Sequence, residues 1–193
     1  MSNTTPRIDP RVLRTRQMLR DAVIELLEEM DIEKISVNRI AERAQINRVT
    51  FYLHYRDLPD MLEKMADDMV EDILEVVNNK DNTQESVEEE NLRILENLLK
   101  HIADHAKFYK IVLTSKRSPI FTDRLFNLMA EIISAHKEKK EGGADHSKIP
   151  IQKDIAIWYG SAALIGTVIA WLRDDMPYTP VYLARQISML RAN

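Results

Sequence analysis

The chain has 193 residues, of which 45% are hydrophobic and 30% charged, a composition typical of a folded soluble protein and not of a disordered one. It contains no cysteine, which excludes disulfide bonds, cysteine-ligated zinc and thiol catalysis. Its 4 glycines against 9 methionines disfavour a β-rich fold or a glycine-rich loop. Long segments of Leu, Ile, Ala, Glu and Lys instead predict an all-α chain.

Charge is distributed unevenly along the sequence. The formal net charge is −4, but residues 1–57 carry +1 and the remainder carries −5. Residues 7–20 hold five arginines and one acid, without the apolar run of a secretory signal. We therefore expect a cytoplasmic protein with a basic tip on an acidic body, as in a protein that presents one end to DNA.

Capping residues predict the first two helices. Asp9 and Pro10 are expected to start a helix whose apolar residues recur at three- and four-residue steps. After a break, Ser36 is expected to cap a second, short helix over residues 37–44.

A third helix follows after a tight turn at residues 45–47, with Asn47 as its cap and its end near His54. Two short helices joined in this way are typical of a helix-turn-helix motif, whose second helix enters the major groove. Phe51, with Val49 or Leu53, is expected to dock on the other two helices. The polar side chains left for a groove or for phosphates are Arg48, Thr50, Tyr52 and His54.

Residues 14–62 resemble the N-terminal domain of the TetR family of bacterial transcriptional regulators. The run from Ser36 to Tyr55 carries the resemblance, with Ile40-Ala41 in the packing positions, a hydroxyl at Thr50 and the Tyr52/His54 pair. The family implies an all-α fold: a helix-turn-helix head at residues 9–56 and a C-terminal regulatory and dimerisation domain at residues 57–193.

The resemblance also implies a function. It predicts a ligand-responsive repressor that binds double-stranded DNA as a homodimer on a near-palindromic operator. Arg48 and Val49 would face bases, and Tyr52 and His54 would hold phosphates. The full set of expected DNA-binding residues is Arg14, Arg16, Ser36, Asn47, Arg48, Val49, Thr50, Tyr52, His54 and Arg56.

Two positions depart from the family pattern. The turn position usually held by glycine is Gln45, which would need a left-handed backbone conformation. The lysine that commonly opens the fourth helix is replaced by Leu58, so one phosphate contact is missing and Arg56 is the expected substitute.

The remaining residues predict a helical body. Helices are expected at residues 57–77, 91–106, 107–115, 120–138, 151–172 and 180–191, with a linker at 78–90 and a loop at 139–149. A small-molecule effector would bind among them. The expected pocket residues are Met65, Met69, Phe108, Tyr109, Phe126, Met129 and Trp158.

Residues 155–172 form an uncharged stretch of 18 residues. We reject a membrane span because the stretch stands alone and is flanked by acids. Its small residues instead suit close approach of a partner helix, as in a two-fold four-helix interface. The expected dimer residues are Ala156, Gly160, Ala163, Thr167, Ala170, Ile187 and Leu190.

Two alternatives compete with a DNA-binding regulator. His101 and His105 have the i, i+4 spacing of a metal pair, although a solvated helix face explains them more simply. A helical interaction protein that has lost DNA binding is the other. No catalytic or cofactor-binding motif was found, so we expect no enzyme activity, no cofactor and no metal.

Overall fold

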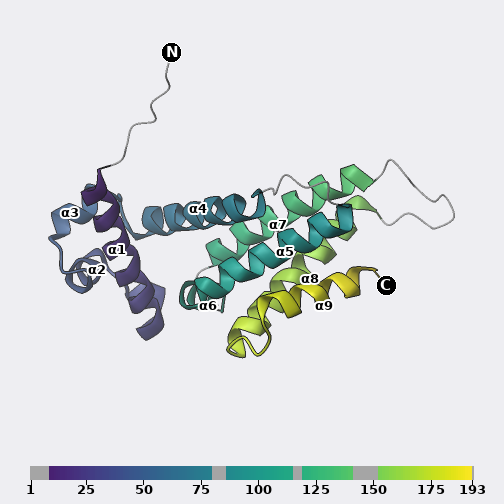
Figure 1. Ribbon diagram of the computed structural model, residues 1–193. Helices are drawn as coiled ribbons and strands as arrows, with labels where there is room; N and C mark the ends of the chain where they lie inside the picture. The colour runs from purple at the N-terminus through teal and green to yellow at the C-terminus, as the bar shows by residue number, and fades with distance from the viewer. Residues whose placement is uncertain (1–8, 80–85, 115–118, 141–151, 193) are drawn as a thin grey trace, which may run out of the picture. The chain divides into compact units, whose positions relative to one another are not determined.

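The structure is a computed structural model (Figure 1). It describes residues 9–79, 86–114, 119–140 and 152–192. Within these ranges the chain is helical and has no strand, which confirms the all-α prediction. Contacts divide the chain into two compact units, Met1–Met65 and Ala66–Asn193. The division falls inside a helix, and the domain boundary expected between residues 56 and 57 stays a prediction.

Helix α1 (Pro10–Glu29) begins as its capping residues predict. The Asp9 carboxylate accepts a hydrogen bond from the Arg11 backbone N–H at 2.9 Å, and Pro10 occupies the first turn. Leu19, Val23 and Leu26 form its buried stripe. The predicted break after this helix contains a short 3-10 helix, η1 (Ile32–Lys34).

Helices α2 (Val37–Arg43) and α3 (Arg48–Tyr52) follow. The Arg39 backbone N–H points at the Ser36 hydroxyl at 3.4 Å, and the Val49 N–H donates to the Asn47 side chain at 2.8 Å. Both predicted caps are therefore in place. Helix α3 ends earlier than expected, with Leu53 as its C-cap.

Helix α4 (Leu58–Val77) starts where Asp57 accepts a hydrogen bond from the Asp60 backbone N–H at 2.8 Å. One apolar side of this helix is buried, with Met61, Met69 and Ile73 each at most 1% exposed. Residues up to Met65 belong to the first unit and later ones to the second.

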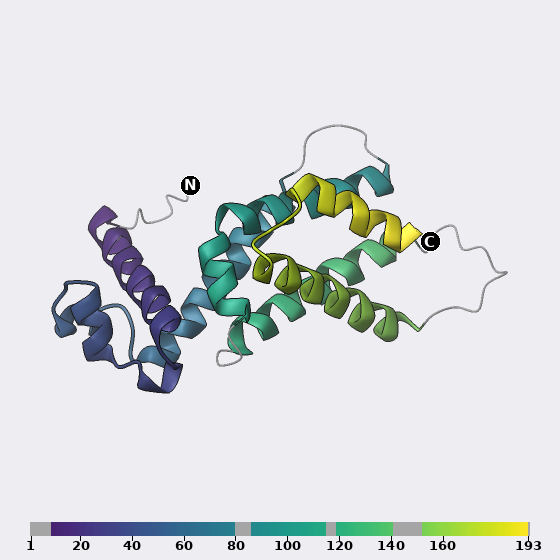
Figure 2. The same cartoon turned by 90° about the horizontal axis from the view of Figure 1, so that it is seen from below.

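In its described residues the second unit consists of the later part of α4 and five further helices. These are α5 (Val87–Asp104), α6 (Ala106–Thr114), α7 (Pro119–Lys140), α8 (Lys153–Arg173) and α9 (Pro180–Ala192). Helix α5 packs on α9, while α8 packs on α6 and α7 (Figure 2). Leu99, Val112, Leu125 and Val168 lie in its core.

The expected start of α5 was wrong. Residues 78–90 were predicted to be a linker, but α5 begins at Val87. Ser86 and Glu89 form a capping box: the Glu89 N–H donates to the Ser86 hydroxyl at 3.3 Å, and the Ser86 N–H donates to the Glu89 carboxylate at 2.9 Å. These hydrogen bonds from Ser86 lower the pKa of Glu89. The acidic run was mistaken for a linker because its first turn carries no bulky buried residue.

In the described part of the chain, α8 alone is long and apolar enough to cross a membrane by length and composition. It packs against α6 and α7, and Leu164, Val168 and Trp171 are buried. About a third of this apolar window is buried within the chain, so the rejection of a membrane span stays a prediction.

Candidate nucleic-acid interface

Helix α3 presents one face to solvent. Arg48, Val49, Tyr52 and Leu53 are exposed, and their i, i+1, i+4, i+5 spacing places them side by side. Phe51 points the other way and is fully buried. The expectation that Phe51 docks α3 on its neighbours is therefore confirmed. The alternatives Val49 and Leu53 are 66% and 76% exposed and do not share that role.

Two of the predicted DNA-binding side chains contact each other. The Arg48 guanidinium donates a hydrogen bond to the Tyr52 hydroxyl at 3.1 Å and lies 5.3 Å from the centre of the Tyr52 ring. This contact gives the arginine a defined direction on the exposed face while leaving its other N–H donors available.

Aromatic side chains cluster within α3 and just after it. The Phe51 ring meets the Tyr52 ring edge-on at 5.6 Å and the Tyr55 ring at the same centroid distance. Tyr55 is 6% exposed, as expected for a core residue. The burial of Phe51 and Tyr55, and not its own length, therefore keeps this short helix in place.

The turn before α3 tolerates a residue other than glycine. Gln45 has φ 55°, the left-handed conformation that the sequence predicted. Its N–H donates to the Glu42 carbonyl at 3.1 Å, and the Ile46 N–H donates to the Ala41 carbonyl at 2.9 Å. This is the Schellman pattern of helix ends, so two hydrogen bonds offset the conformational cost at Gln45.

A buried carboxylate organises the connection between α3 and α4. Asp60 is 7% exposed. It accepts hydrogen bonds from the Arg56 backbone N–H at 2.9 Å, the Arg56 Nε at 3.1 Å and the Lys64 Nζ at 3.0 Å. Lys64 also donates to the His54 carbonyl at 3.2 Å. Hydrogen bonding from the Arg56 backbone and from Lys64 lowers the pKa of Asp60 to about 2.

The Arg56 side chain is both hydrogen-bonded to Asp60 and exposed to solvent. Its side chain is 81% exposed although its guanidinium is hydrogen-bonded to Asp60. The hydrogen bond to Asp60 raises the pKa of Arg56. An arginine held in this way keeps donors for a further acceptor, as a phosphate contact requires.

His54 lies partly buried beside this connection. Burial, and then the nearby positive charge of Arg16, lower the pKa of His54 below its ordinary value of 6.5. The imidazole is therefore mainly neutral at pH 7. It can offer one N–H donor to a phosphate without carrying a charge.

The other predicted DNA-binding residues take two kinds of position. Arg14 and Arg16 are exposed on α1, and Thr50 is half-buried. The oxygens of Ser36 and Asn47 are engaged as helix caps, so these two residues position α2 and α3.

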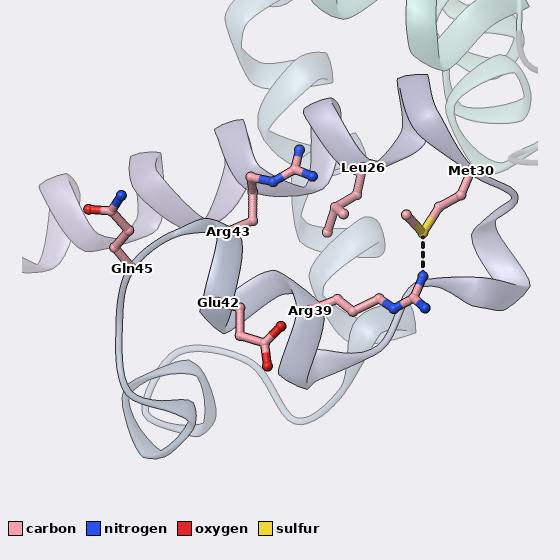
Figure 3. A pocket seen from close by; sticks show the side chains of 6 residues that line it. All are labelled: Leu26, Met30, Arg39, Glu42, Arg43 and Gln45. Carbon is pink, nitrogen blue, oxygen red and sulfur yellow. Dashed lines mark hydrogen bonds between the residues drawn. The ribbon is translucent and has the colours of Figure 1, made fainter.

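A depression of about 450 Å³ lies between α1 and α2 (Figure 3). It is lined by Leu26, Met30, Arg39, Glu42, Arg43 and Gln45. Arg39 donates to the Met30 sulfur at 2.9 Å (Figure 3), and Arg43 pairs with Glu29 at 2.7 Å. The hydrogen bond from Arg43 lowers the pKa of Glu29. These contacts tie α2 to α1 and so stabilise the motif behind the exposed helix.

None of the seven predicted effector-pocket residues lines this depression. Met69, Tyr109 and Met129 are buried in the second unit, where Phe108 and Phe126 are partly buried; Met65 is buried in the first unit. Trp158 is 57% exposed. The expected pocket stays a prediction for all seven residues.

The predicted dimer residues of α8 do not all share one face. Ala163 and Ala170 are exposed and Thr167 is half-buried, but a Cβ at Gly160 would lie 3.3 Å from Ile133 on α7. The small residues that α8 exposes include Ala162 and Gly166, which the sequence analysis missed. On α9, Ile187 is buried and Leu190 is 79% exposed.

His101 and His105 stack at 4.6 Å between ring centres. The His101 Nε2 is hydrogen-bonded to the Tyr109 hydroxyl at 2.8 Å, and the His105 Nδ1 to the His101 carbonyl at 2.9 Å. Burial and the neighbouring His105 lower the pKa of His101. Among the described residues no group of three or more His, Asp or Glu side chains suited to a metal was found, and the absence of a metal stays a prediction.

A three-helix head with a short, exposed third helix, followed by a helical body, defines the class of helix-turn-helix transcriptional regulators. The TetR-type family model "Transcriptional regulator C-terminal region" matches residues 89–193, more than half of the chain. The chain therefore belongs to the TetR family of transcriptional regulators.

Individual relatives are distant. The chain is 21% identical over 170 residues to the HTH-type transcriptional regulator YxbF of Bacillus subtilis (strain 168), covering 88% of this chain and 42% of that protein. It thus spans less than half the length of that curated relative. The fatty acid degradation regulator FadR of Bacillus halodurans shares the fold at TM-score 0.71 and 20% identity, over 95% of each chain. FadR of Bacillus subtilis, solved in complex with stearoyl-CoA, does so at TM-score 0.62 and 19% identity, over 90% of this chain and 96% of that one.

Proposed function

We propose that this chain represses transcription in the cytoplasm by binding double-stranded DNA sequence-specifically as a homodimer. The observation that carries the proposal is the outward face of α3, where Arg48 is directed by Tyr52 while Phe51 anchors the opposite side. An arginine on such a face suits the O6 and N7 acceptors of guanine in the major groove.

Phosphate contacts would surround this helix. Tyr52 and neutral His54 offer hydrogen-bond donors, and Arg56 offers the donors that Asp60 leaves free. Arg14 and Arg16 on α1 would add positive charge to the same unit. Such contacts set affinity and register, whereas Arg48 and Val49 would set sequence preference.

Dimerisation would use the exposed faces of α8 and α9. Tyr159, Ala162, Gly166 and Ala170 on α8 are all exposed, and small side chains permit close helix approach. Two-fold pairing would present two copies of α3 to two half-sites about one helical turn of DNA apart.

A small molecule would change DNA affinity by binding one conformation of the dimer better than another. Because one structure of the same fold was solved with stearoyl-CoA, a long-chain acyl-CoA is the first effector class to test. Titration calorimetry with stearoyl-CoA, and with coenzyme A as control, measures this directly.

The proposal is tested by selecting bound fragments from random-sequence duplex DNA at moderate salt. We expect a near-palindromic consensus, and loss of one base preference in it for Arg48→Ala. Lys100→Ala, an exposed cation on α5, is the matched control and should leave both affinity and consensus unchanged. Failure to enrich any sequence, even at low salt, would contradict the proposal.

A further inference from the structure

The exposed face of α3 is more apolar than a phosphate-binding surface requires. Val49 and Leu53 lie one helical turn apart and are 66% and 76% exposed. Single exposed aliphatic residues are common on protein surfaces, but here two neighbours occupy the helix that is proposed to enter DNA.

These two side chains are not needed for packing. The buried rings of Phe51 and Tyr55 already hold α3 against its unit, at 0% and 6% exposure. Exposed aliphatic groups gain free energy only when a partner removes them from water. The position of Val49 and Leu53 therefore points to a ligand surface that is itself apolar.

In the major groove of DNA the thymine 5-methyl is the apolar group among the edges of the four bases. We propose that Val49 and Leu53 form a strip that packs against thymine methyl groups and makes thymine a determinant of the operator. This inference rests on the proposed DNA-binding function and adds the base that the apolar side chains recognise.

The surrounding charges favour DNA as the occupant of this strip. Arg48 lies on the same exposed face, and Arg16 is close enough to His54 to lower the pKa of that residue electrostatically. Cations beside an apolar strip suit a polyanion with apolar groups in its groove.

Helix geometry predicts the spacing of the two thymines. Four residues of α-helix rise about 6 Å, and consecutive base pairs of DNA are about 3.4 Å apart. With the helix lying along the groove, Val49 and Leu53 would reach methyl groups about two base-pair steps apart.

The test removes single methyl groups from the DNA. In the selected operator each thymine is replaced in turn by deoxyuridine, which keeps base pairing and lacks only the methyl, and the Kd is measured by fluorescence anisotropy. We expect about fourfold weaker binding at each contacted position, the value for one buried methyl-sized group. Val49→Ala and Leu53→Ala should each abolish the effect at one position.

Leu13→Ala is the matched control, because Leu13 is an exposed leucine of α1 in the same unit, at 51% exposure. It should leave the deoxyuridine pattern unchanged. Thermal melts should show all three variants folded, since each truncates an exposed side chain.

Three results would overturn the inference. Tight binding that is insensitive to every deoxyuridine would remove the methyl contact while leaving the proposed function intact. If no DNA sequence were selected, both the methyl contact and the proposed DNA-binding function would be contradicted. A Leu53→Ala variant that weakens self-association in the ultracentrifuge, with an unaltered deoxyuridine pattern, would assign the strip to a protein contact.

Discussion

The Asp60 carboxylate accepts hydrogen bonds from both the backbone N–H and the guanidinium of Arg56, at 2.9 and 3.1 Å. One buried acid thus fixes the chain just after α3 and directs an exposed cation at the same time. Lys64 donates to the same carboxylate and to the His54 carbonyl, so hydrogen bonds link His54 and Arg56 before α4 to Asp60 and Lys64 within it. Local stability and DNA contact should therefore change together when Asp60 is altered.

Asp60→Asn tests this coupling. The amide retains the shape of the side chain but loses the negative charge that Arg56 and Lys64 share, so charge-assisted hydrogen bonds become weaker. We expect a melting temperature lower by about 5 °C, measured by circular dichroism. Asp57→Asn is the control, because asparagine caps a helix about as well as aspartate and should change the melting temperature little.

The stabilisation that Asp60 provides should decrease as the pH falls. The pKa of Asp60 is lowered from its ordinary value of 3.8 to about 2 in the folded chain, so the unfolded chain binds the proton more readily. The stabilisation is fully present above pH 3.8 and is lost as pH falls towards 2. Urea titrations should show the difference between wild type and Asp60→Asn shrinking across this interval; a constant difference would contradict the assignment.

The Arg48–Tyr52 contact predicts non-additive effects on DNA binding. Arg48→Ala should weaken binding to the selected operator by about 1–3 kcal/mol and relax one base preference. Tyr52→Phe removes the hydroxyl that accepts from Arg48 and should weaken binding to all sequences, with part of the loss arising through a less restrained Arg48. Anisotropy titrations of both single variants and the double variant form the cycle. Strictly additive losses would show that the contact does not couple the two residues on DNA.

Sequence patterns predicted the starts of α1, α2 and α3 because Asp9, Ser36 and Asn47 are capping residues, whose effect is local. The outward face of α3 was harder to predict. A helix of five residues is too short to show a period, so Val49 and Leu53 could have faced either way. The tertiary contacts that bury Phe51 determine that Val49 and Leu53 face solvent.

The hydrogen-bonding roles of Asp60 and Lys64 were also missed, since they depend on the fold of the connection between α3 and α4. An acidic residue three positions after the Asp57 cap was the available signal. For α8, the sequence predicted a stripe of small residues, but only the packing of α7 distinguishes Gly160 from Gly166.

Because the pKa of His101 is lowered, we expect the folded chain to lose stability in mild acid. Burial and His105 lower the pKa of His101 below 6.5, while Asp72 and Asp104 oppose this change. The folded chain therefore binds this proton less readily than the unfolded chain. The corresponding stability is complete above pH 6.5 and falls as pH drops through the lowered pKa.

His101→Gln removes this titration and keeps a side chain able to form hydrogen bonds. The variant should lose less stability than wild type between pH 7 and pH 5, as measured by chemical unfolding. His105→Gln removes the neighbouring histidine that helps to lower this pKa and keeps His101, so it should reduce the pH dependence by a smaller amount. Equal pH dependence in wild type and His101→Gln would show that His101 does not contribute.

Substitutions at Gly160 and Gly166 of α8 can distinguish packing within one subunit from pairing between two subunits. A Cβ at Gly166 meets no atom within 4 Å, so Gly166→Glu starts its side chain in open space and places a charge on the proposed dimer face. We expect it to shift the molecule towards monomer in the analytical ultracentrifuge and to weaken operator binding at least tenfold, because one half-site is then read alone.

Gly160→Ala is the matched variant, since its new Cβ would lie 3.3 Å from Ile133 and must displace that side chain slightly. It should alter thermal stability modestly and leave self-association unchanged. If Gly166→Glu remained dimeric while Gly160→Ala dissociated, the face of α8 proposed for pairing would be the wrong one. Pairing would then have to use a surface other than the one that carries Tyr159, Ala162 and Gly166.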